Sequence, residues 1–225
     1  MKLLVGERYR ERLKRLTEYA DVLWMPDNPV VDPRLAGHAD LAAINIDNDI
    51  FAANDIICDF FIKNNIRIKK AERPQASVYP GDAGLCACIT EDTAIFNPNT
   101  IDPVIKRQIK SAEKIHVKQG YAKCTVCAVS SRAFITADAG IEKELKKRNI
   151  SVLKINEGCI RLDGFPTGFI GGATIILNDK IFFTGTLDLH PDKEKIISYT
   201  AENNLKPVFL TEEPLFDIGS AVILP

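Results

Sequence analysis

Long apolar runs are missing from this sequence of 225 residues, and so is a strong excess of charge of either sign. No stretch approaches the length that spans a bilayer, and the opening MKLLVGERYRER becomes charged too early for a secretory signal. The formal net charge of −1 gives no reason to expect nucleic-acid binding. We therefore expect a cytoplasmic protein of bacterial type, with no membrane and no nucleic acid among its partners.

Histidine and cysteine are also scarce, with three and six residues. Without a secretory signal, the six cysteines are expected to be reduced thiols rather than a disulfide framework. Hydrophobic content of 46% and charged content of 26% are typical of globular proteins. We expect one domain that covers residues 1–225.

What is present is a repeat. Four times, a short apolar strand crosses a polar turn into a second strand that carries a phenylalanine, with anchors at Phe51, Phe96, Phe134 and Phe182. Seven positions before each anchor stands an apolar residue: Ile44, Ile89, Cys127 and Ile175. A period near 40 residues indicates stacked or radially arranged units.

A helical pattern and another strand follow each hairpin, so each unit reads strand, strand, helix, strand. Asp102-Pro103 is typical of a helix cap followed by proline at the first helical position. Apolar residues at helical spacing continue that segment, with lysines and arginines left for water. Further helices are predicted over 56–63, around 141–150 and over 191–199, with following strands over 66–68, 114–117, 151–155 and 207–210.

The chain ends supply a fifth unit that is split. The N-terminus begins with a strand at 2–5, a predicted helix over Glu7–Tyr19 and a strand at 22–25, while the last strand, 221–224, has no partner after it. Pairing the N- and C-terminal strands completes the unit and closes a ring. The predicted fold is therefore α/β, a five-bladed α/β propeller of pseudo-fivefold ββαβ repeats; the alternative is an open α/β sheet.

In a closed ring, the innermost strands begin near the axis, so the segments at their starts should converge. Those segments are unusually rich in His, Cys, Asp, Lys and Gly, and buried polar groups are costly unless they are paired or used. They are residues 38–41, 81–88, 118–124, 168–172 and 217–220.

This architecture resembles the pentein fold of the guanidino-modifying enzymes, which include deiminases, dimethylargininase and amidinotransferases as well as non-catalytic proteins. The strings KQGYAKCTVCAV, GFIGGATIIL, FFTG, HPD and DIGS are similar to a bacterial family of that fold whose function is uncharacterised. The resemblance implies a Cys thiolate that attacks a guanidinium carbon, a His that acts as acid and base, and carboxylates that hold the guanidinium.

Two local strings carry the catalytic part of the resemblance. His38-Ala-Asp40 resembles the His-x-Asp segment of the deiminases, and the glycine-rich segment that ends in Cys88 resembles GGGxxHCxT. Cys88 is then the implied nucleophile and Cys86 the competing register, since strand alternation puts both on one face. Asp40, on the same strand face as His38, is expected to fix its tautomer and raise its pKa.

The sequence also departs from the enzyme pattern. The C-terminal segment Asp217-Ile-Gly-Ser220 carries no Cys, whereas the enzymes close on their Cys segment. The strings with His38 and Cys88 lie two blades earlier than usual, so equivalence would require rotating the ring.

Further residues near the predicted axis form a ligand-binding set. Carboxylates suit planar recognition of a guanidinium, whereas lysines suit an anion. The set comprises Asp82, Lys118, Tyr121, Lys123, Cys124, Asp163, Gly171, Gly172 and Asp217.

Several residues of reactive type have structural interpretations. Cys58 and Cys127 are expected in the core, His116 within a strand, and His190 at a helix start. A zinc site of Cys86, Cys88, Cys124 and Cys127 lacks the turn that such ligands need. We expect neither a metal nor another cofactor.

The sequence thus predicts a small polar ligand in an axial pocket. One hypothesis is a Cys/His-dependent hydrolase or transferase, deiminase-like or amidinotransferase-like, that acts on a guanidino or amidino compound. The alternative is a non-catalytic protein that binds a small anionic metabolite or a protein partner. The oligomeric state is not determined.

Overall fold

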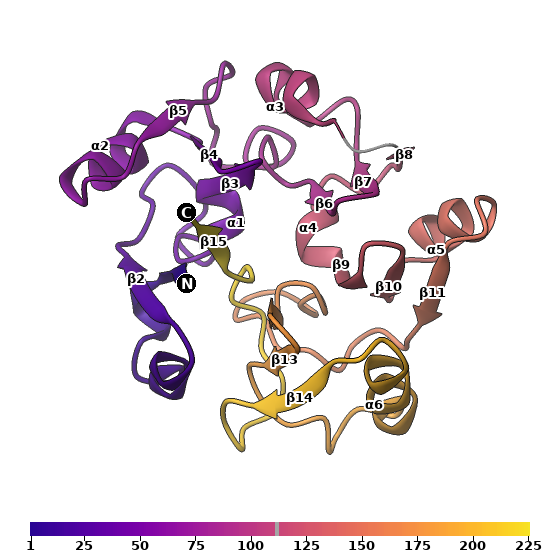
Figure 1. Ribbon diagram of the computed structural model, residues 1–225. Helices are drawn as coiled ribbons and strands as arrows, with labels where there is room; N and C mark the ends of the chain where they lie inside the picture. Colours follow the sequence, from indigo (N-terminus) through magenta and orange to yellow (C-terminus); the bar gives the residue numbers. More distant parts are fainter. Residues whose placement is uncertain (111–112) are drawn as a thin grey trace.

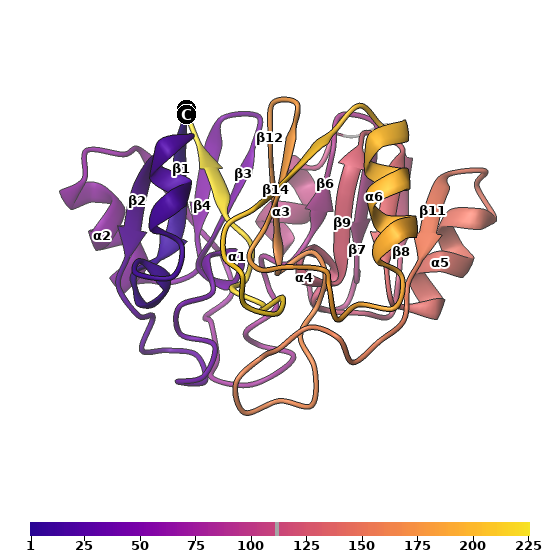
Figure 2. The same cartoon turned by 90° about the horizontal axis from the view of Figure 1, so that it is seen from below.

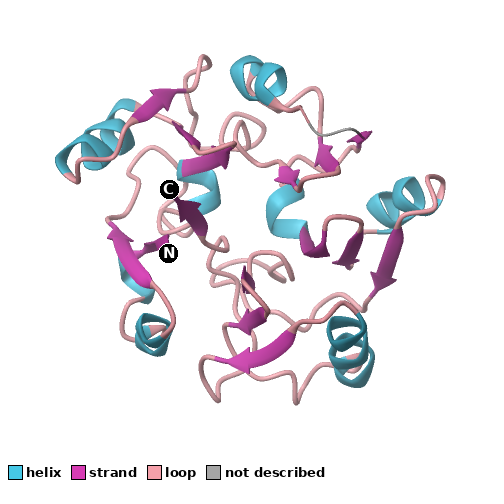
Figure 3. Ribbon diagram, in the orientation of Figure 1, coloured by secondary structure: helices cyan, strands magenta, loops and turns pink. Residues whose placement is uncertain are grey.

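Five small sheets of three strands each make up the computed structural model, which describes residues 1–110 and 113–225. Figure 1 shows the sheets placed around a common centre, and the longer helices lie on the outside (Figure 3). The middle strand of each sheet runs antiparallel to one neighbour and parallel to the other. The fold is therefore α/β, as the strand and helix patterns predict.

The strands follow the predicted order. The first sheet has β1 (Lys2–Gly6), β2 (Asp21–Met25) and β15 (Val222–Leu224), and the second has β3 (Ala43–Ile46), β4 (Asp49–Ala52) and β5 (Ile68–Lys70). The third has β6 (Cys88–Ile89), β7 (Thr93–Phe96) and β8 (Glu113–His116). The fourth has β9 (Val126–Ser130), β10 (Ala133–Thr136) and β11 (Ser151–Lys154), and the fifth has β12 (Thr174–Leu177), β13 (Lys180–Phe183) and β14 (Lys206–Phe209).

The phenylalanine anchors lie in the middle strand of their sheets and are buried, which confirms the hairpin prediction. Ile44 is the direct cross-strand partner of Phe51, and Ile175 of Phe182. In β9 and β10 a register shift moves the partner of Phe134 to Ala128. These rings pack in the apolar layers between neighbouring sheets and under the outer helices.

Four outer helices follow the hairpins: α2 (Asp55–Lys63), α3 (Pro103–Gln108), α5 (Ala139–Lys146) and α6 (Lys193–Glu202). The Asp102 side chain accepts the Val104 N–H at the start of α3, as its sequence predicts. Helices α2, α5 and α6 are each followed by an asparagine with positive φ, at Asn65, Asn149 and Asn204. The next residue in each case is apolar and returns its N–H to the helix, which ends the helix and aims the chain at the third strand.

The predicted helix over Glu7–Tyr19 is wrong. Two short 3₁₀ helices stand there, η1 (Glu7–Tyr9) and η2 (Lys14–Glu18). The apolar residues Leu13, Leu16 and Tyr19 repeat every three positions, which suits the three residues per turn of a 3₁₀ helix.

The two chain ends meet in one sheet. Strand β15 pairs antiparallel with β1, Lys2 opposite Leu224, and β1 pairs parallel with β2. Both termini consequently lie side by side (Figures 1 and 2). Across residues 1–110 and 113–225, no helix combines the length and apolar character needed to cross a membrane.

Candidate functional site

The polar segments that precede the innermost strands come together at the centre. Two of them contain single helical turns, α1 (Ala39–Ala42) before β3 and α4 (Ala122–Thr125) before β9. Figure 2 shows both turns at the end of the strands where the long loops lie. The predicted strand conformation is wrong: His38 precedes α1 and Asp40 lies in it, so they do not share a strand face.

Each segment contacts the next around the centre. The contacts are Cys86 Sγ to the Asp40 carbonyl (3.8 Å), Tyr121 O–H to Asp82 (2.8 Å), Gly172 N–H to the Cys124 carbonyl (2.9 Å), Phe169 N–H to Asp217 (2.8 Å) and Asp40 N–H to the Gly219 carbonyl (3.2 Å). These bonds hold five distant parts of the chain in register, so the polar side chains between them are firmly positioned.

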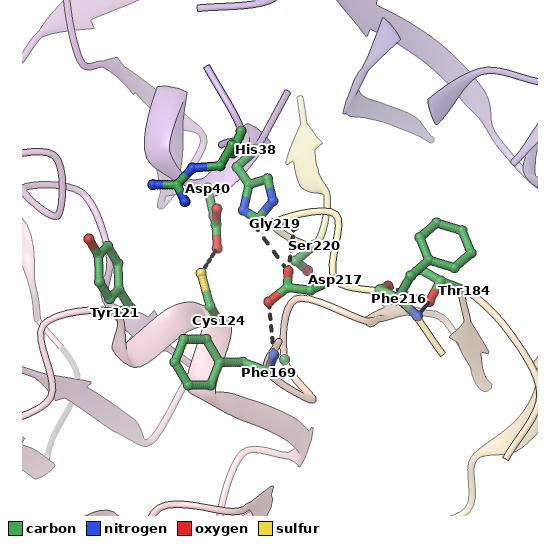
Figure 4. A network of polar contacts seen from close by, with 12 residues as sticks. His38, Asp40, Tyr121, Cys124, Phe169, Thr184, Phe216, Asp217, Gly219 and Ser220 are labelled. Atoms are coloured by element: carbon green, nitrogen blue, oxygen red, sulfur yellow. Dashed lines mark hydrogen bonds and ion pairs between the residues drawn. The ribbon is translucent and has the colours of Figure 1, made fainter. Parts of the chain in front are cut away.

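Three side chains form the middle of this arrangement: His38, Asp40 and Cys124 (Figure 4). The Cys124 thiol donates to Asp40 Oδ2 at 2.6 Å. One potential ligand atom from each of the three lies within 4.8 Å of the other two. All three are buried, at 3%, 2% and 4% exposure. We call them the central triad.

Asp217 stands beside the central triad. Its two carboxylate oxygens accept the N–H groups of Phe169 (2.8 Å) and Gly219 (2.9 Å), and Oδ1 lies 4.0 Å from His38 Nδ1. Gly219 has φ +70°, and a Cβ there would collide with His38. A glycine therefore lets the C-terminal segment approach the imidazole closely.

The site holds carboxylates without buried counter-ions. Asp40, Asp82 and Asp217 are buried, whereas no lysine or arginine is buried in the part of the chain that the structure describes. Burial raises the pKa of Asp40 to about 7 and raises the pKa of Asp82 and Asp217 as well. The environment therefore favours a cation that would bind between these carboxylates.

Asp40 does not act on His38 as predicted. His38 is the residue that precedes α1, and burial lowers its pKa, the opposite of the predicted direction. Asp40 points to Cys124 instead, and Asp217 is the carboxylate nearest the imidazole in the network. The imidazole is consequently neutral at physiological pH and can accept a proton.

The thiols near the centre are protonated in the free protein. A hydrogen bond with Cys86, together with burial, raises the pKa of Cys124 well above its usual value. For Cys86 the same hydrogen bond acts to lower the pKa. Burial and the nearby Asp40 carboxylate act in the opposite direction and outweigh it, so the pKa of Cys86 is raised overall. Burial also raises the pKa of Cys88. Cys88 opens β6 and borders a cavity that Asp40 and Lys123 also line.

The other predicted binding residues divide into two groups. Tyr121 and Asp82 bond to each other near the centre, and Lys123 is half-buried. Lys118 is exposed, and only its carbonyl is engaged, by Asn97. Asp163 is also exposed and lies 3.8 Å from Arg161. Neither of the last two reaches the central triad.

Gly171 and Gly172 serve close packing of the chain on itself. A Cβ at Gly171 would collide with the carbonyl oxygens of Lys123, Cys124 and Val126, and one at Gly172 with Asp217. These glycines let the segment before β12 pack directly against the backbone of α4, which holds Cys124 in place.

Gly171→Ala is expected to lower the free energy of unfolding by about 1–3 kcal/mol or more, because backbone atoms cannot move aside. Urea unfolding measures the change. Gly84→Ala is the matched control, since the nearest atom to its Cβ would be 3.9 Å away. Equal stabilities of the two variants would contradict the close packing.

Two cavities flank the buried centre. One, of about 440 Å³, is bordered by Asp40, Cys88 and Lys123. The other, of about 260 Å³, is bordered by Asp217 and by four arginines that sequence reasoning missed: Arg8, Arg12, Arg34 and Arg161. Arg8 and Arg34 are paired with Asp27 and Asp32. No local pattern marks the four as a group, because they come from three separate loops or turns.

The other cysteines and histidines behave structurally. Cys58 lies in α2 within the core, and Cys127 is buried in β9, as predicted. His116 ends β8. His190 accepts the Asp192 N–H at 3.1 Å just before α6. A four-cysteine zinc site does not form among the described residues, where the only metal-compatible group is the central triad.

Comparisons with known proteins agree with this fold. A family model described as a family of unknown function matches residues 4–222. No curated protein sequence matches the chain.

Solved structures match over most of the chain. Agmatine deiminase of C. jejuni has 11% identity, covers 93% of this chain and 87% of its own, and has a TM-score of 0.62. DDAH from Pseudomonas aeruginosa, in complex with citrulline, has 7% identity and a TM-score of 0.61. The match covers 92% of this chain and 91% of DDAH. The product-bound N-terminal domain of ArgZ, a cyanobacterial arginine dihydrolase, has 12% identity and a TM-score of 0.55. The match covers 92% of this chain and 89% of the ArgZ domain. These are pentein-fold enzymes, and this chain has the same fold.

Proposed function

The chain belongs to the family of unknown function DUF6873, and we propose that it acts on a small guanidino or amidino compound as a hydrolase or transferase. The solved structures that share its fold include a deiminase, DDAH and a dihydrolase, but their identity of 12% or less shows the fold alone. The proposal therefore rests on the site.

One observation carries it: a thiol, an imidazole and buried carboxylates converge with no buried cation among them. Asp40 and Asp217 lie on either side of His38 and Cys124, and their charges lack a buried partner. A planar cation offers several N–H donors to such carboxylates and would replace the missing counter-ion. Its carbon would then stand next to a thiol, which is the arrangement that covalent catalysis needs.

In the proposed reaction each residue has one role. Cys124 Sγ attacks the guanidinium carbon and gives its proton to Asp40, which passes it to the leaving amine. Water then attacks the thiouronium carbon and gives one proton to His38. As the C–S bond breaks, His38 returns that proton to the thiolate, and the second water proton leaves the urea oxygen for the released ammonia. The sum is guanidinium plus water to urea plus ammonium; an amine in place of water makes the reaction a transfer.

Cys124 is preferred over the thiols that the sequence resemblance implies. Its Sγ belongs to the group that also contains His38 and Asp40, whereas Cys86 is outside that group and its thiol is directed to the Asp40 carbonyl. Cys88 borders the cavity next to Asp40. Cys86 and Cys88 remain the alternatives, with Asp82, Tyr121, Lys123 and Asp217 as the proposed binding residues around them.

The same contacts support the proposed architecture. We infer that residues 1–225 form one domain, a five-bladed α/β propeller closed by the pairing of β15 with β1. Each sheet would be one blade, and the polar segments would line the axis. The sequence of contacts around the centre, and the pairing of the terminal strands, favour this arrangement over an open sheet.

A second function is favoured by a separate observation, the four arginines around the cavity next to Asp217. The ion pairs of Arg12 and Arg161 are long, to Glu213 (3.9 Å) and Asp163 (3.8 Å), and Arg12 also lies over the Phe216 ring at the cavity wall, so both guanidinium groups are available to a ligand. This cavity would suit a small anionic metabolite, bound without chemistry.

A ligand screen tests the two functions against each other. Guanidino and amidino compounds are expected to raise the thermal unfolding temperature, because a ligand at 100 times its Kd adds about 2.7 kcal/mol to the free energy of unfolding. Release of ammonia or amine from the same compounds measures turnover. Stabilisation by small anions alone, with no turnover, would reject the hydrolase and favour the binding function.

A further inference from the structure

The central triad contains two buried polar atoms that lack partners among the described residues. His38 Nε2 and Asp40 Oδ1 have no hydrogen-bond partner within residues 1–110 and 113–225. Each such atom costs about 1–3 kcal/mol when it is removed from water unpaired. Because both belong to residues that are 3% or less exposed, a species bound between them would satisfy them together.

The chemical types and spacing of the triad indicate which species fits. An imidazole nitrogen, a carboxylate oxygen and a thiol sulfur lie within 4.8 Å of one another. Zinc binds these three ligand types at about 2.0–2.3 Å, so its ligands in a tetrahedron are about 3.5 Å apart. Small side-chain rotations would bring the three atoms to that spacing.

The surroundings of His38 resemble those of a metal-binding histidine. Nδ1 faces Asp217 Oδ1 at 4.0 Å, while Nε2 is the nitrogen that lacks a partner. Metal-bound histidines commonly donate their other N–H to a carboxylate, which sets the tautomer and orients the ring. Asp217 is itself held by the N–H groups of Phe169 and Gly219 (Figure 4), so it can play this orienting part.

We propose that His38 Nε2, an Asp40 oxygen and Cys124 Sγ bind a zinc ion, with a fourth position left for water or another ligand. Binding would transfer the Cys124 thiol proton to solvent and replace the S–H···O contact with Asp40 by two bonds to one ion. The spacing of the cysteines does not indicate this site, because its three ligands are of different types and come from two distant segments of the chain.

This metal site uses the same three side chains as the proposed reaction, His38, Asp40 and Cys124, but metal binding does not depend on that reaction. A thiolate that is bound to zinc is not free to attack a substrate carbon. Added zinc is therefore expected to suppress any turnover that Cys124 performs. Binding itself can be measured without substrate, so a negative result for one proposal leaves the other testable.

Cobalt substitution tests the site. The purified full chain, stripped with a chelator, is titrated with Co²⁺ and Zn²⁺, and bound metal is measured by elemental analysis. We expect one equivalent, with a near-ultraviolet thiolate-to-cobalt absorption band that Zn²⁺ abolishes. Cys124→Ser should lose the band, and Asp217→Asn should weaken metal binding by ~10–100-fold through the orientation of His38.

Cys159→Ser is the control, because Cys159 is a half-buried thiol in a loop outside the triad. This variant should bind like the unmodified chain, and circular dichroism of each metal-free variant shows that it is folded. The proposal is overturned by less than stoichiometric binding, by a band that persists in Cys124→Ser, or by a band that is lost in Cys159→Ser.

Discussion

Cys124→Ala is expected to lower turnover of a guanidino or amidino substrate by ~10³-fold or more, since removal of a covalent nucleophile typically abolishes this chemistry. The thiol cannot be replaced by a neighbour without rearrangement, because Cys124 is the cysteine grouped with His38 and Asp40. Substrate binding should survive, because the carboxylates that would hold the cation are untouched. The measurement is initial rate of ammonia or amine release, together with ligand-induced thermal stabilisation.

Two further variants make this result specific. Cys159→Ala should retain full turnover, since that side chain lies in a loop away from the centre. Cys88→Ala tests Cys88 against Cys124 as the nucleophile. If Cys124→Ala kept full activity and Cys88→Ala lost it, the nucleophile would be Cys88 in β6, as the sequence resemblance implies. The central triad would then not perform the reaction.

Phe182→Ala is expected to lower the free energy of unfolding by about 3–5 kcal/mol, as large-to-small changes of a buried aromatic residue do. The ring has no exposed surface, packs between the first and fifth sheets, and meets Tyr19 edge-on at 4.9 Å between ring centres. Loss of the ring would leave a cavity where the terminal sheet meets its neighbour. Denaturant unfolding, followed by circular dichroism, measures the change.

Leu189→Ala is the matched control, because that side chain is 74% exposed and should change stability by less than about 0.5 kcal/mol. A loss below 1 kcal/mol in Phe182→Ala would mean that the phenylalanine anchor does not stabilise the junction between these sheets.

The repeat could be read from the sequence because it is made of local signals. Alternating apolar residues, the anchor phenylalanines and the Asp102-Pro103 cap each act over a few residues, and their elements appear where predicted. The N-terminal helix was wrong for a related reason. Leu13, Leu16 and Tyr19 are spaced by three residues, which fits the 3₁₀ period better than the α-helical period.

The candidate site was only half predictable. The polar segments that meet at the centre were identified, and so were His38, Asp40, Cys124 and Asp217 as their members. Their conformation and pairing were not: single helical turns replace strand starts and turn Asp40 toward Cys124. The four arginines beside Asp217 were not predicted, because they come from three separate parts of the chain: the N-terminal segment with Arg8 and Arg12, and the segments with Arg34 and Arg161.

By itself, the sequence determined which segments are polar and that they recur at the same place in each unit. Every unit repeats the same pattern of apolar core residues, so the polar residues that interrupt this pattern fall at equivalent positions. Only the tertiary structure decided which thiol meets which carboxylate. Asp40 and Cys124 are separated by 84 residues and touch across the centre. That contact depends on the angle and distance between sheets, which side-chain packing sets and no local pattern encodes.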